Sequence, residues 1–244
     1  MGRQREASAE LTALGDKLNT SSTNAMTTEP PTTVPQARWH GPQRRIGVTG
    51  GIASGKSSVG LYLSEQHALP LLDADIYARD ALVAGSAATM AVLQRYGNAV
   101  AEAGQCNPVS LDRIALANII FSDVEERRWV EQLIHPIVAK RFDVALADLS
   151  AEAVVVLMIP LLFEAKLTGL CSDVWLVDCS PPQQCQRLIA RDGLTLQEAE
   201  QRIAAQWPLE RKRPLADLVI DNSGTVESCH QQIEQNINGI QKRA

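Results

Sequence analysis

The residues with the clearest chemical potential are 50–57, which read G-G-I-A-S-G-K-S and match G-x-x-x-x-G-K-[ST] throughout. In such a loop the backbone N–H groups turn inward around phosphate oxygens, and glycines permit the backbone angles this requires. Lys56 is expected to reach the β- and γ-phosphates, and the Ser57 hydroxyl to be a ligand of Mg²⁺. The loop therefore predicts nucleotide binding, while the phosphoryl acceptor stays open.

Two carboxylates, Asp73 and Asp75, follow an apolar run at residues 68–72. Ligands of open α/β sheets bind beyond the carboxyl ends of the strands, so both side chains are expected near the phosphates. A carboxylate there can hold Mg²⁺ through water, for which Asp73 is the candidate, or accept the proton of an attacking hydroxyl, and the pair beside the loop favours a functional role for at least one of the two. The alternative for Asp75 is to cap the helix expected from Ile76, and the sequence leaves both roles open.

Basic residues gather between the last two expected strands, where a helical hairpin is predicted. They are Arg187, Arg191, Arg202, Arg211, Lys212 and Arg213. Arginine binds phosphate through its planar fork, so such a hairpin would act as a lid that excludes water and neutralises charge. The alternative is a solvated face with pairs such as Glu198 and Arg202.

The scaffold that must position these groups is an alternation of strands and helices. Strands are expected at residues 45–49, 68–72, 153–159, 173–178 and 217–221, with helices at 56–66, 181–190, 196–206 and 226–242. Residues 76–149 are expected to be largely helical, with an interruption at 104–108 and a helix break at His135-Pro136. The alternation predicts an α/β fold built on a doubly wound parallel sheet.

Composition excludes several classes of protein. The 244 residues carry a formal net charge of −5, which argues against a general nucleic-acid binder. No apolar run approaches the ~18 residues that span a membrane. The five cysteines form no C-x-x-C pair, which favours free thiols in a reducing cytoplasm. No obligate protein partner is indicated.

Residues 1–43 are expected to be a disordered tail, because the stretch 20–35 is rich in Thr, Ser and Pro and has almost no large apolar residue. Met26 lies within it, and we hypothesise that translation starts there. N-terminal sequencing of the native protein that found Met1 or Gly2 would refute this hypothesis.

Taken together, the motifs resemble the dephospho-coenzyme A kinase family from residue 45 to the C-terminal helix. The matching segments come in the family's order: IGVTGGIASGKS, LDAD, LIHP, IPLLFE, the arginine-bearing lid and ADLVIDNSG. The resemblance implies transfer of the γ-phosphoryl group of ATP, with Mg²⁺, to the ribose 3′-hydroxyl of dephospho-coenzyme A, the final step of coenzyme A synthesis. It also implies a P-loop kinase-type core (44–75, 150–184 and 214–244), a helical substrate-binding insertion (76–149) and a lid (185–213).

The resemblance also assigns roles to residues. It implies that Asp75, Lys56 and Arg191 are catalytic and that Asp75 lines the acceptor site with His135, Leu161 and Glu164. The residues implied for ATP are Gly51, Ala53, Ser54, Gly55, Lys56, Ser57, Ser58 and Asn222. Ala53 stands where many members have Gly, and is expected to be tolerated if its φ is negative; Ser58 stands where Thr is common.

Two other functions remain open on the residues alone. Another small-molecule kinase of the same architecture, such as a nucleoside monophosphate kinase, would share the loop. A nucleotide-dependent regulatory switch would share it too, although the N-K-x-D motif that reads guanine is absent from the sequence.

Overall fold

The computed structural model describes residues 37–102 and 108–240. Most of the expected tail (1–36), including the hypothetical start at Met26, lies outside these ranges, as do residues 103–107 and 241–244. Within the described ranges, no helix is long and apolar enough to cross a membrane.

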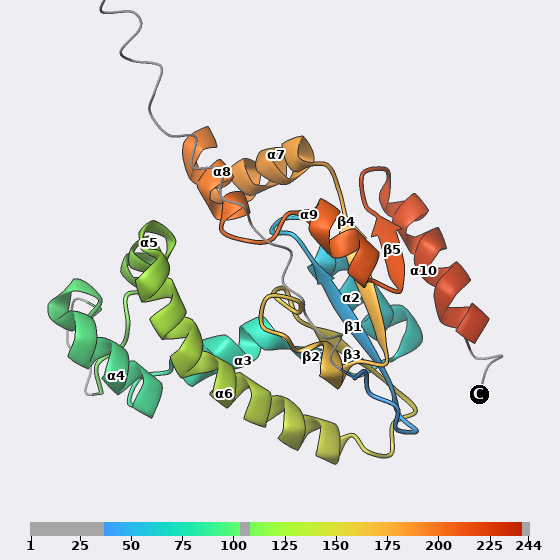
Figure 1. Ribbon diagram of the computed structural model, residues 1–244, viewed down its shortest axis with the longest axis horizontal. Coiled ribbons are helices and arrows are strands. Elements are labelled where there is room, and N and C mark those ends of the chain that lie inside the picture. The colour runs from blue at the N-terminus through green and yellow to red at the C-terminus, as the bar shows by residue number, and fades with distance from the viewer. Residues whose placement is uncertain (1–36, 103–107, 241–244) are drawn as a thin grey trace, which may run out of the picture. The chain divides into compact units, whose positions relative to one another are not determined.

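The centre of the protein is a parallel sheet (Figure 1). Its strands are β1 (Arg44–Gly50), β2 (Leu71–Asp73), β3 (Val154–Met158), β4 (Asp173–Asp178) and β5 (Leu218–Asp221), in the order β2-β3-β1-β4-β5. The chain leaves the central strand β1 towards β2 and β3 on one side, and then reaches β4 and β5 on the other. The carboxyl end of β1 is therefore the point where ligands bind in doubly wound sheets.

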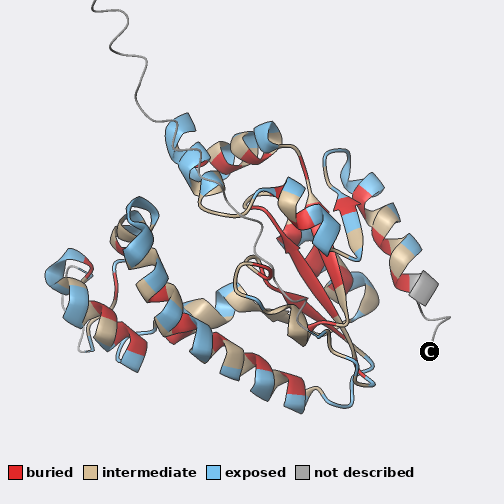
Figure 2. Cartoon of the chain, in the orientation of Figure 1, coloured by how far each residue is buried: buried red, intermediate tan, exposed pale blue. Residues whose placement is uncertain are grey.

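Both faces of the sheet are covered, which confirms the predicted doubly wound α/β fold. Alternate residues of β3 point to opposite sides: Val155 and Leu157 join one buried cluster, and Val156 joins the other. Helices α2 (Lys56–His67) and α10 (Val226–Ile240) complete the Val156 side. Helices α3 (Ala74–Ala81) and α6 (Val124–Asp148) complete the other, and the buried strands between them stand out in Figure 2.

The region between β2 and β3 is helical, as expected. It contains α3, α4 (Ala87–Tyr96), the short 3-10 helix η1 (Gly97–Ala99), α5 (Arg113–Ser122) and α6. Side-chain oxygens of Ser86, Asp112 and Asp123 accept backbone N–H groups at the starts of α4, α5 and α6. These caps satisfy donors that have no partner inside the helix, so they fix where each helix begins.

The predicted helix break at His135-Pro136 is wrong, because α6 runs continuously through Pro136. Proline removes one helical hydrogen bond, which would have joined its nitrogen to the carbonyl of Gln132. Both Pro136 and Gln132 are exposed, so water can satisfy that carbonyl. The buried face, with Val130, Ile134, Val138, Phe142 and Leu146, continues across the proline at a spacing of four residues. Burial of that face outweighs the local preference of proline.

A second helical segment lies between β4 and β5, where the basic hairpin was expected. We call residues 181–215 the lid segment, after the lid that the sequence predicts there. It contains α7 (Pro181–Asp192), α8 (Leu196–Ala204), α9 (Leu209–Lys212) and the 3-10 helix η3 (Arg213–Leu215); a further 3-10 helix, η2 (Thr168–Leu170), precedes β4. Capping boxes start α7 at Ser180 and α8 at Thr195. Gly193, in the left-handed conformation with φ of 67°, ends α7.

The run 68–72 differs from its prediction as a strand, since β2 begins only at Leu71. Ala68 takes a left-handed φ of 53° and ends α2 by donating its N–H to the carbonyl of Leu63. A left-handed residue cannot continue an extended strand, so the turn after α2 uses the first residues of the apolar run.

We predict that Phe142→Ala lowers the free energy of unfolding by about 3–5 kcal/mol. The Phe142 ring is fully buried and meets Tyr77 edge to face, with ring centroids 5.0 Å apart. Urea unfolding measures the loss. Val144→Ala on the same helix removes a side chain that is 54% exposed, and should change stability by less than about 0.5 kcal/mol. Equal losses in both variants would contradict the placement of α6 against the sheet.

Candidate active site

The phosphate-binding loop (residues 50–57) joins the end of β1 to the start of α2, as the motif predicts. Gly55 adopts φ of 101°, a conformation that side chains disfavour. Within the described residues no side chain caps the start of α2, so N–H groups of its first turn are free to meet an anion. Ser57 and Ser58 are exposed at the start of α2, whereas Ser54, within the loop, is buried.

The loop is held from outside by amide side chains distant in the sequence. Gln184 Nε2 donates to the Ile52 carbonyl at 2.7 Å, and Gln206 Oε1 accepts from the Ile52 N–H at 2.8 Å. Asn222 Nδ2 donates to the Ser54 carbonyl at 2.8 Å. A Cβ atom on Gly51 would lie 2.1 Å from Gln184 Nε2, which explains the glycine there. Sequence reasoning missed Gln184 and Gln206, because amide contacts of this kind leave no spacing signal.

Lys56 is buried beneath the loop. Its Nζ donates to the carbonyl of Gly51 at 2.6 Å. Burial desolvates the ammonium and lowers the pKa of Lys56 to about 8, with smaller opposing contributions from Asp75 and Glu164. The charges of Lys212 and Arg191 lower this pKa further. Lys56, Asp75, Glu164, Lys212 and Arg191 therefore form one electrostatic cluster around the loop.

The two carboxylates after β2 have different positions. Asp73 caps α3, since its Oδ1 accepts the N–H of Asp75 at 2.8 Å. The sequence left open whether Asp75 caps α3. In the structure the cap is Asp73 instead. Neighbouring atoms desolvate the Asp75 carboxyl and raise its pKa, and the charge of Asp73 raises it further. Lys56 and Arg191 oppose this rise, so both cations act on the Asp75 carboxylate.

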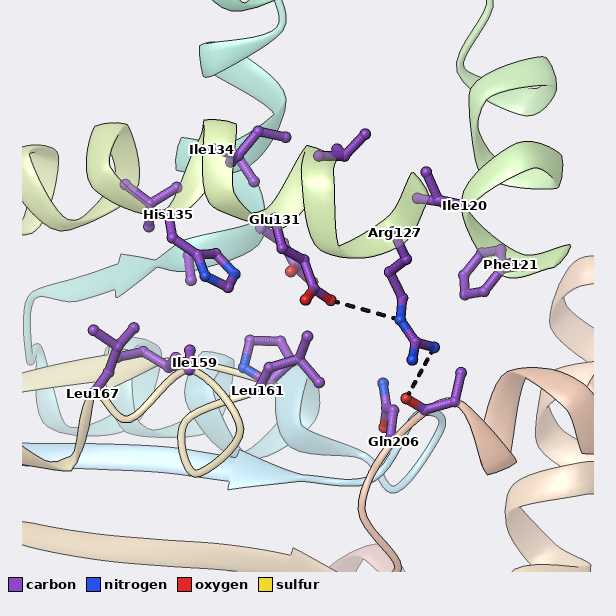
Figure 3. Close-up of a pocket in the computed structure, with 18 residues that line it drawn as sticks. Ile120, Phe121, Arg127, Glu131, Ile134, His135, Ile159, Leu161, Leu167 and Gln206 are labelled. Atoms are coloured by element: carbon purple, nitrogen blue, oxygen red, sulfur yellow. Dashed lines mark hydrogen bonds and ion pairs between the residues drawn. The ribbon is translucent and has the colours of Figure 1, made fainter. Parts of the chain in front are cut away.

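A pocket of about 290 Å³ opens beside Asp75, and we call it the Asp75 pocket (Figure 3). It brings together Asp75, His135 and Leu161, three of the four residues implied for the acceptor. Its walls come from helices α3, α5 and α6, the turn after β3, and the link between α8 and α9. The remaining polar lining residues are Arg127, Glu131 and Gln206. Sequence reasoning did not find these three.

Glu164, the fourth expected acceptor residue, does not line the Asp75 pocket. Its Oε1 lies 2.7 Å from Nζ of Lys212, whose side chain is fully buried. The same oxygen accepts the N–H of Trp207 at 3.1 Å. Glu164 therefore ties the turn after β3 to the end of the lid segment.

The remaining basic residues of the lid segment mostly contact the protein itself. Arg191 forms two hydrogen bonds with Asp192, and Arg202 pairs with Asp192 at 3.3 Å. Glu198 completes the capping box of α8. Arg187 donates to the carbonyl of Asn222 at 2.8 Å. Arg211 stacks on the ring of Trp207, and Arg213 pairs with Asp178.

From the sequence, alanine at position 53 was expected to be tolerated if its φ is negative. In the structure the φ of Ala53 is positive, at 56°. For an alanine this left-handed conformation brings Cβ close to the following carbonyl, at a cost of about 1–2 kcal/mol. The chain thus accepts backbone strain within the phosphate-binding loop, where surrounding contacts hold its shape.

Within the described ranges, no group of three or more His, Cys, Asp or Glu side chains is placed to hold a metal ion. The cysteines at 171, 179, 185 and 229 are free thiols.

The parallel sheet, the loop after its central strand and the cluster around Lys56 define a P-loop kinase. A family model for dephospho-CoA kinase matches residues 44–228. The chain belongs to the dephospho-CoA kinase family.

Individual relatives support the same family assignment. A curated protein of Prochlorococcus marinus (strain MIT 9313), named dephospho-CoA kinase, is 88% identical over 200 residues, which is 82% of this chain and 98% of the relative. The crystal structure of TT1252 from Thermus thermophilus superimposes with a TM-score of 0.67 at 32% identity, covering 82% of this chain and 99% of that one. Dephospho-CoA kinase from Campylobacter jejuni shares the fold, with a TM-score of 0.55 at 22% identity over 81% of this chain and 97% of that one.

We predict that Ala53→Gly stabilises the protein by up to about 1 kcal/mol, because glycine adopts the left-handed conformation without strain. Urea midpoints measure the gain. Ala147→Gly, at an exposed helical position of α6, should instead lose about 0.5–1 kcal/mol. A loss of stability in the Ala53 variant would show that the loop does not strain this residue.

The affinity for a non-hydrolysable ATP analogue should fall as the pH rises through about 8, where Lys56 loses its charge. Below that pH the ammonium attracts the phosphates, and above it the neutral amine does not. Calorimetric titration from about pH 7 to about pH 9.5 measures the change. Lys56→Met should bind weakly with no such fall, so parallel curves for the two proteins would rule out Lys56 as the titrating group.

Proposed function

We propose that this chain transfers the γ-phosphoryl group of ATP to the ribose 3′-hydroxyl of dephospho-coenzyme A, in the cytoplasm. The observation that carries the proposal is the position of Asp75. Its carboxylate lines a pocket large enough to admit part of an acceptor, and it is also in electrostatic contact with Lys56 of the phosphate-binding loop. Membership of the dephospho-CoA kinase family supports the choice of acceptor, and the free thiols support a reducing compartment.

The donor half uses the loop and the start of α2. Backbone N–H groups within residues 53–58 and the ammonium of Lys56 are suited to hold the phosphates of ATP, apart from the N–H groups of Ser54 and Ser58, which donate to the carbonyls of Gly51 and Gly55. Asn222 supports the loop at the carbonyl of Ser54. The exposed hydroxyl of Ser57 and the carboxylate of Asp73 are hard oxygen ligands of the type that Mg²⁺ takes. When bound, that ion would neutralise charge on the phosphates.

The acceptor half is assigned to the Asp75 pocket. Asp75 would orient the attacking hydroxyl and take its proton, and its raised pKa makes it a stronger base than an aspartate of ordinary pKa. His135 and Leu161 would contact the body of the acceptor. Arg191, whose charge acts on both Lys56 and Asp75, would stabilise charge on the group in transfer. Glu164 would act on the acceptor only indirectly, through Lys212 and Trp207.

The proposal also divides the chain by role. Segments 44–75, 150–184 and 214–244 would form the nucleotide-binding core, residues 76–149 the acceptor-binding region, and residues 185–213 a lid. Most of the rate would come from positioning and electrostatic stabilisation, since phosphoryl transfer asks little covalent chemistry of the protein.

ATP consumption with and without dephospho-coenzyme A tests the proposal. We expect turnover only with that acceptor, and coenzyme A as the product. A panel of nucleoside monophosphates should give no comparable rate. Turnover that needs no acceptor, a preference for GTP, or a faster reaction with a nucleoside monophosphate would each contradict the proposed acceptor.

Asp75→Asn should lower kcat by about 10²–10⁴-fold, because the amide cannot accept the proton. Affinity for ATP should change little. Asp73→Asn is the matched control, since asparagine still caps α3 and turnover should persist at raised Mg²⁺. Near-normal kcat in Asp75→Asn would remove Asp75 from the role of base.

A further inference from the structure

Gln206 is in contact with both halves of the site. It lies in the short link between α8 and α9 and is half-buried. Its side-chain oxygen accepts the N–H of Ile52 in the phosphate-binding loop at 2.8 Å. The same side chain lines the Asp75 pocket. No catalytic or binding role follows from its sequence context.

The orientation of the Gln206 amide is fixed by chemistry. A backbone N–H can only donate, so the atom that faces Ile52 must be the oxygen. The nitrogen of the amide consequently lies on the other side, and Figure 3 shows it directed towards the pocket. Within the described residues this nitrogen makes no hydrogen bond. Its two N–H donors are therefore available to a molecule in the pocket.

Gln184 provides a natural comparison. It donates to the carbonyl of Ile52 at 2.7 Å, so the peptide groups around Ile52 are held by two glutamines. Gln184 belongs to α7, at the beginning of the lid segment, and only 3% of it is exposed. It does not line the Asp75 pocket. Gln184 therefore supports the loop alone, whereas Gln206 supports the loop and faces the pocket.

We infer that Gln206 is a positioning residue that couples the two substrates. Its oxygen holds the phosphate-binding loop at Ile52, and its NH₂ group donates to an oxygen of the acceptor, either a hydroxyl or a phosphoryl oxygen. The pocket is lined mainly by apolar side chains, so a neutral donor there is shielded from water and keeps its strength. An acceptor that engages this NH₂ group fixes the amide, and the fixed amide in turn fixes the loop that holds ATP. The inference rests on the proposed donor and acceptor.

The coupling is measured as the ratio of affinities for a non-hydrolysable ATP analogue with and without dephospho-coenzyme A. In the wild type this ratio should be at least about fivefold, and linkage requires the same factor in the reverse titration. Gln206→Glu keeps an oxygen for Ile52 and loses the NH₂ group, so its ratio should fall to near one. A constant repulsion between the new carboxylate and ATP cancels in the ratio.

Two further variants complete the comparison. Gln206→Met removes both hydrogen bonds and should weaken binding of the analogue by about 3- to 10-fold while also losing the coupling. Gln184→Met should weaken binding of the analogue similarly but keep the wild-type ratio, because it loosens the loop without touching the pocket. Thermal unfolding checks that each variant is folded, and Gln206→Glu keeps the test decisive if a Met variant is not.

The outcomes separate the inference from the proposed function. A wild-type ratio of one, or an unchanged ratio in Gln206→Glu, overturns the inference even where the enzyme consumes ATP with dephospho-coenzyme A. Matching losses of coupling in Gln206→Met and Gln184→Met would reduce Gln206 to a support of the loop. Failure of the wild type to bind or phosphorylate dephospho-coenzyme A would overturn the proposed function, and the inference with it.

Discussion

The structure depends on keeping one cation, Lys56, buried and charged beneath a loop that must also receive phosphates. An isolated buried ammonium is costly, and its lowered pKa records that cost. The order of the strands in the sheet offsets part of this desolvation cost. Because β3 and β2 lie beside β1 in succession, the carboxylates that follow them, Glu164 and Asp75, come close enough to act on Lys56. Both carboxylates also have a second neighbour: Glu164 pairs with Lys212, and Asp75 lines the pocket. The carboxylates that compensate Lys56 thus also line the Asp75 pocket or hold the segments beside it, which is the proposed acceptor side.

A second constraint follows from the loop itself. The N–H groups that are to meet phosphates must point inward, so internal hydrogen bonds, such as the one from the Ser54 N–H to the Gly51 carbonyl, can hold only part of the loop. Support has to come from outside, and the side chains that give it are Gln184, Gln206 and Asn222. All three come from the C-terminal part of the chain, whereas the loop motif lies near the beginning of the fold. The anion site is therefore complete only when β4 has paired with β1, β5 with β4, and the helical segment between β4 and β5 has packed against the loop. The left-handed Ala53 is tolerated for the same reason, since contacts from distant segments fix the backbone around it.

Much of this could be predicted from the sequence, and the parts that could not share a physical cause. The loop and the strand β4 were predictable because their signals are local: glycine spacing and a β-branched run. The break at Pro136 was a wrong prediction because a local preference was weighed without the buried face on the other side of α6. The partner of Glu164 was missed because a single buried lysine, Lys212, looks in the sequence like one more basic residue of a lid. Arg127, Glu131 and Gln206 were missed because pocket walls assembled from four separate segments leave no period or spacing. Of the pocket residues, Asp75 was reached through its position after a predicted strand, and His135 and Leu161 only through the order of the motifs.

Desolvation acts in opposite directions on the pKa values of Lys56, which is buried, and Asp75, which is exposed but has lost part of its hydration to neighbouring atoms. Desolvation lowers the pKa of Lys56 and raises that of Asp75, so the pH range in which both carry charge is narrower than for the same pair in water. Their mutual attraction widens it again, since each charge favours the ionised form of the other. A base is most effective when its pKa approaches the working pH, and a phosphate-binding lysine is useful only while it is protonated. The two requirements are compatible because one group is a carboxylate and the other an amine: desolvation raises the pKa of Asp75, the proposed base, while a pKa of about 8 leaves Lys56 protonated at neutral pH. An arrangement with the charges further apart would lose the attraction and keep the desolvation. Proximity of Asp75 to Lys56 therefore offsets part of the desolvation of both groups, and it would place the proposed base beside the phosphates.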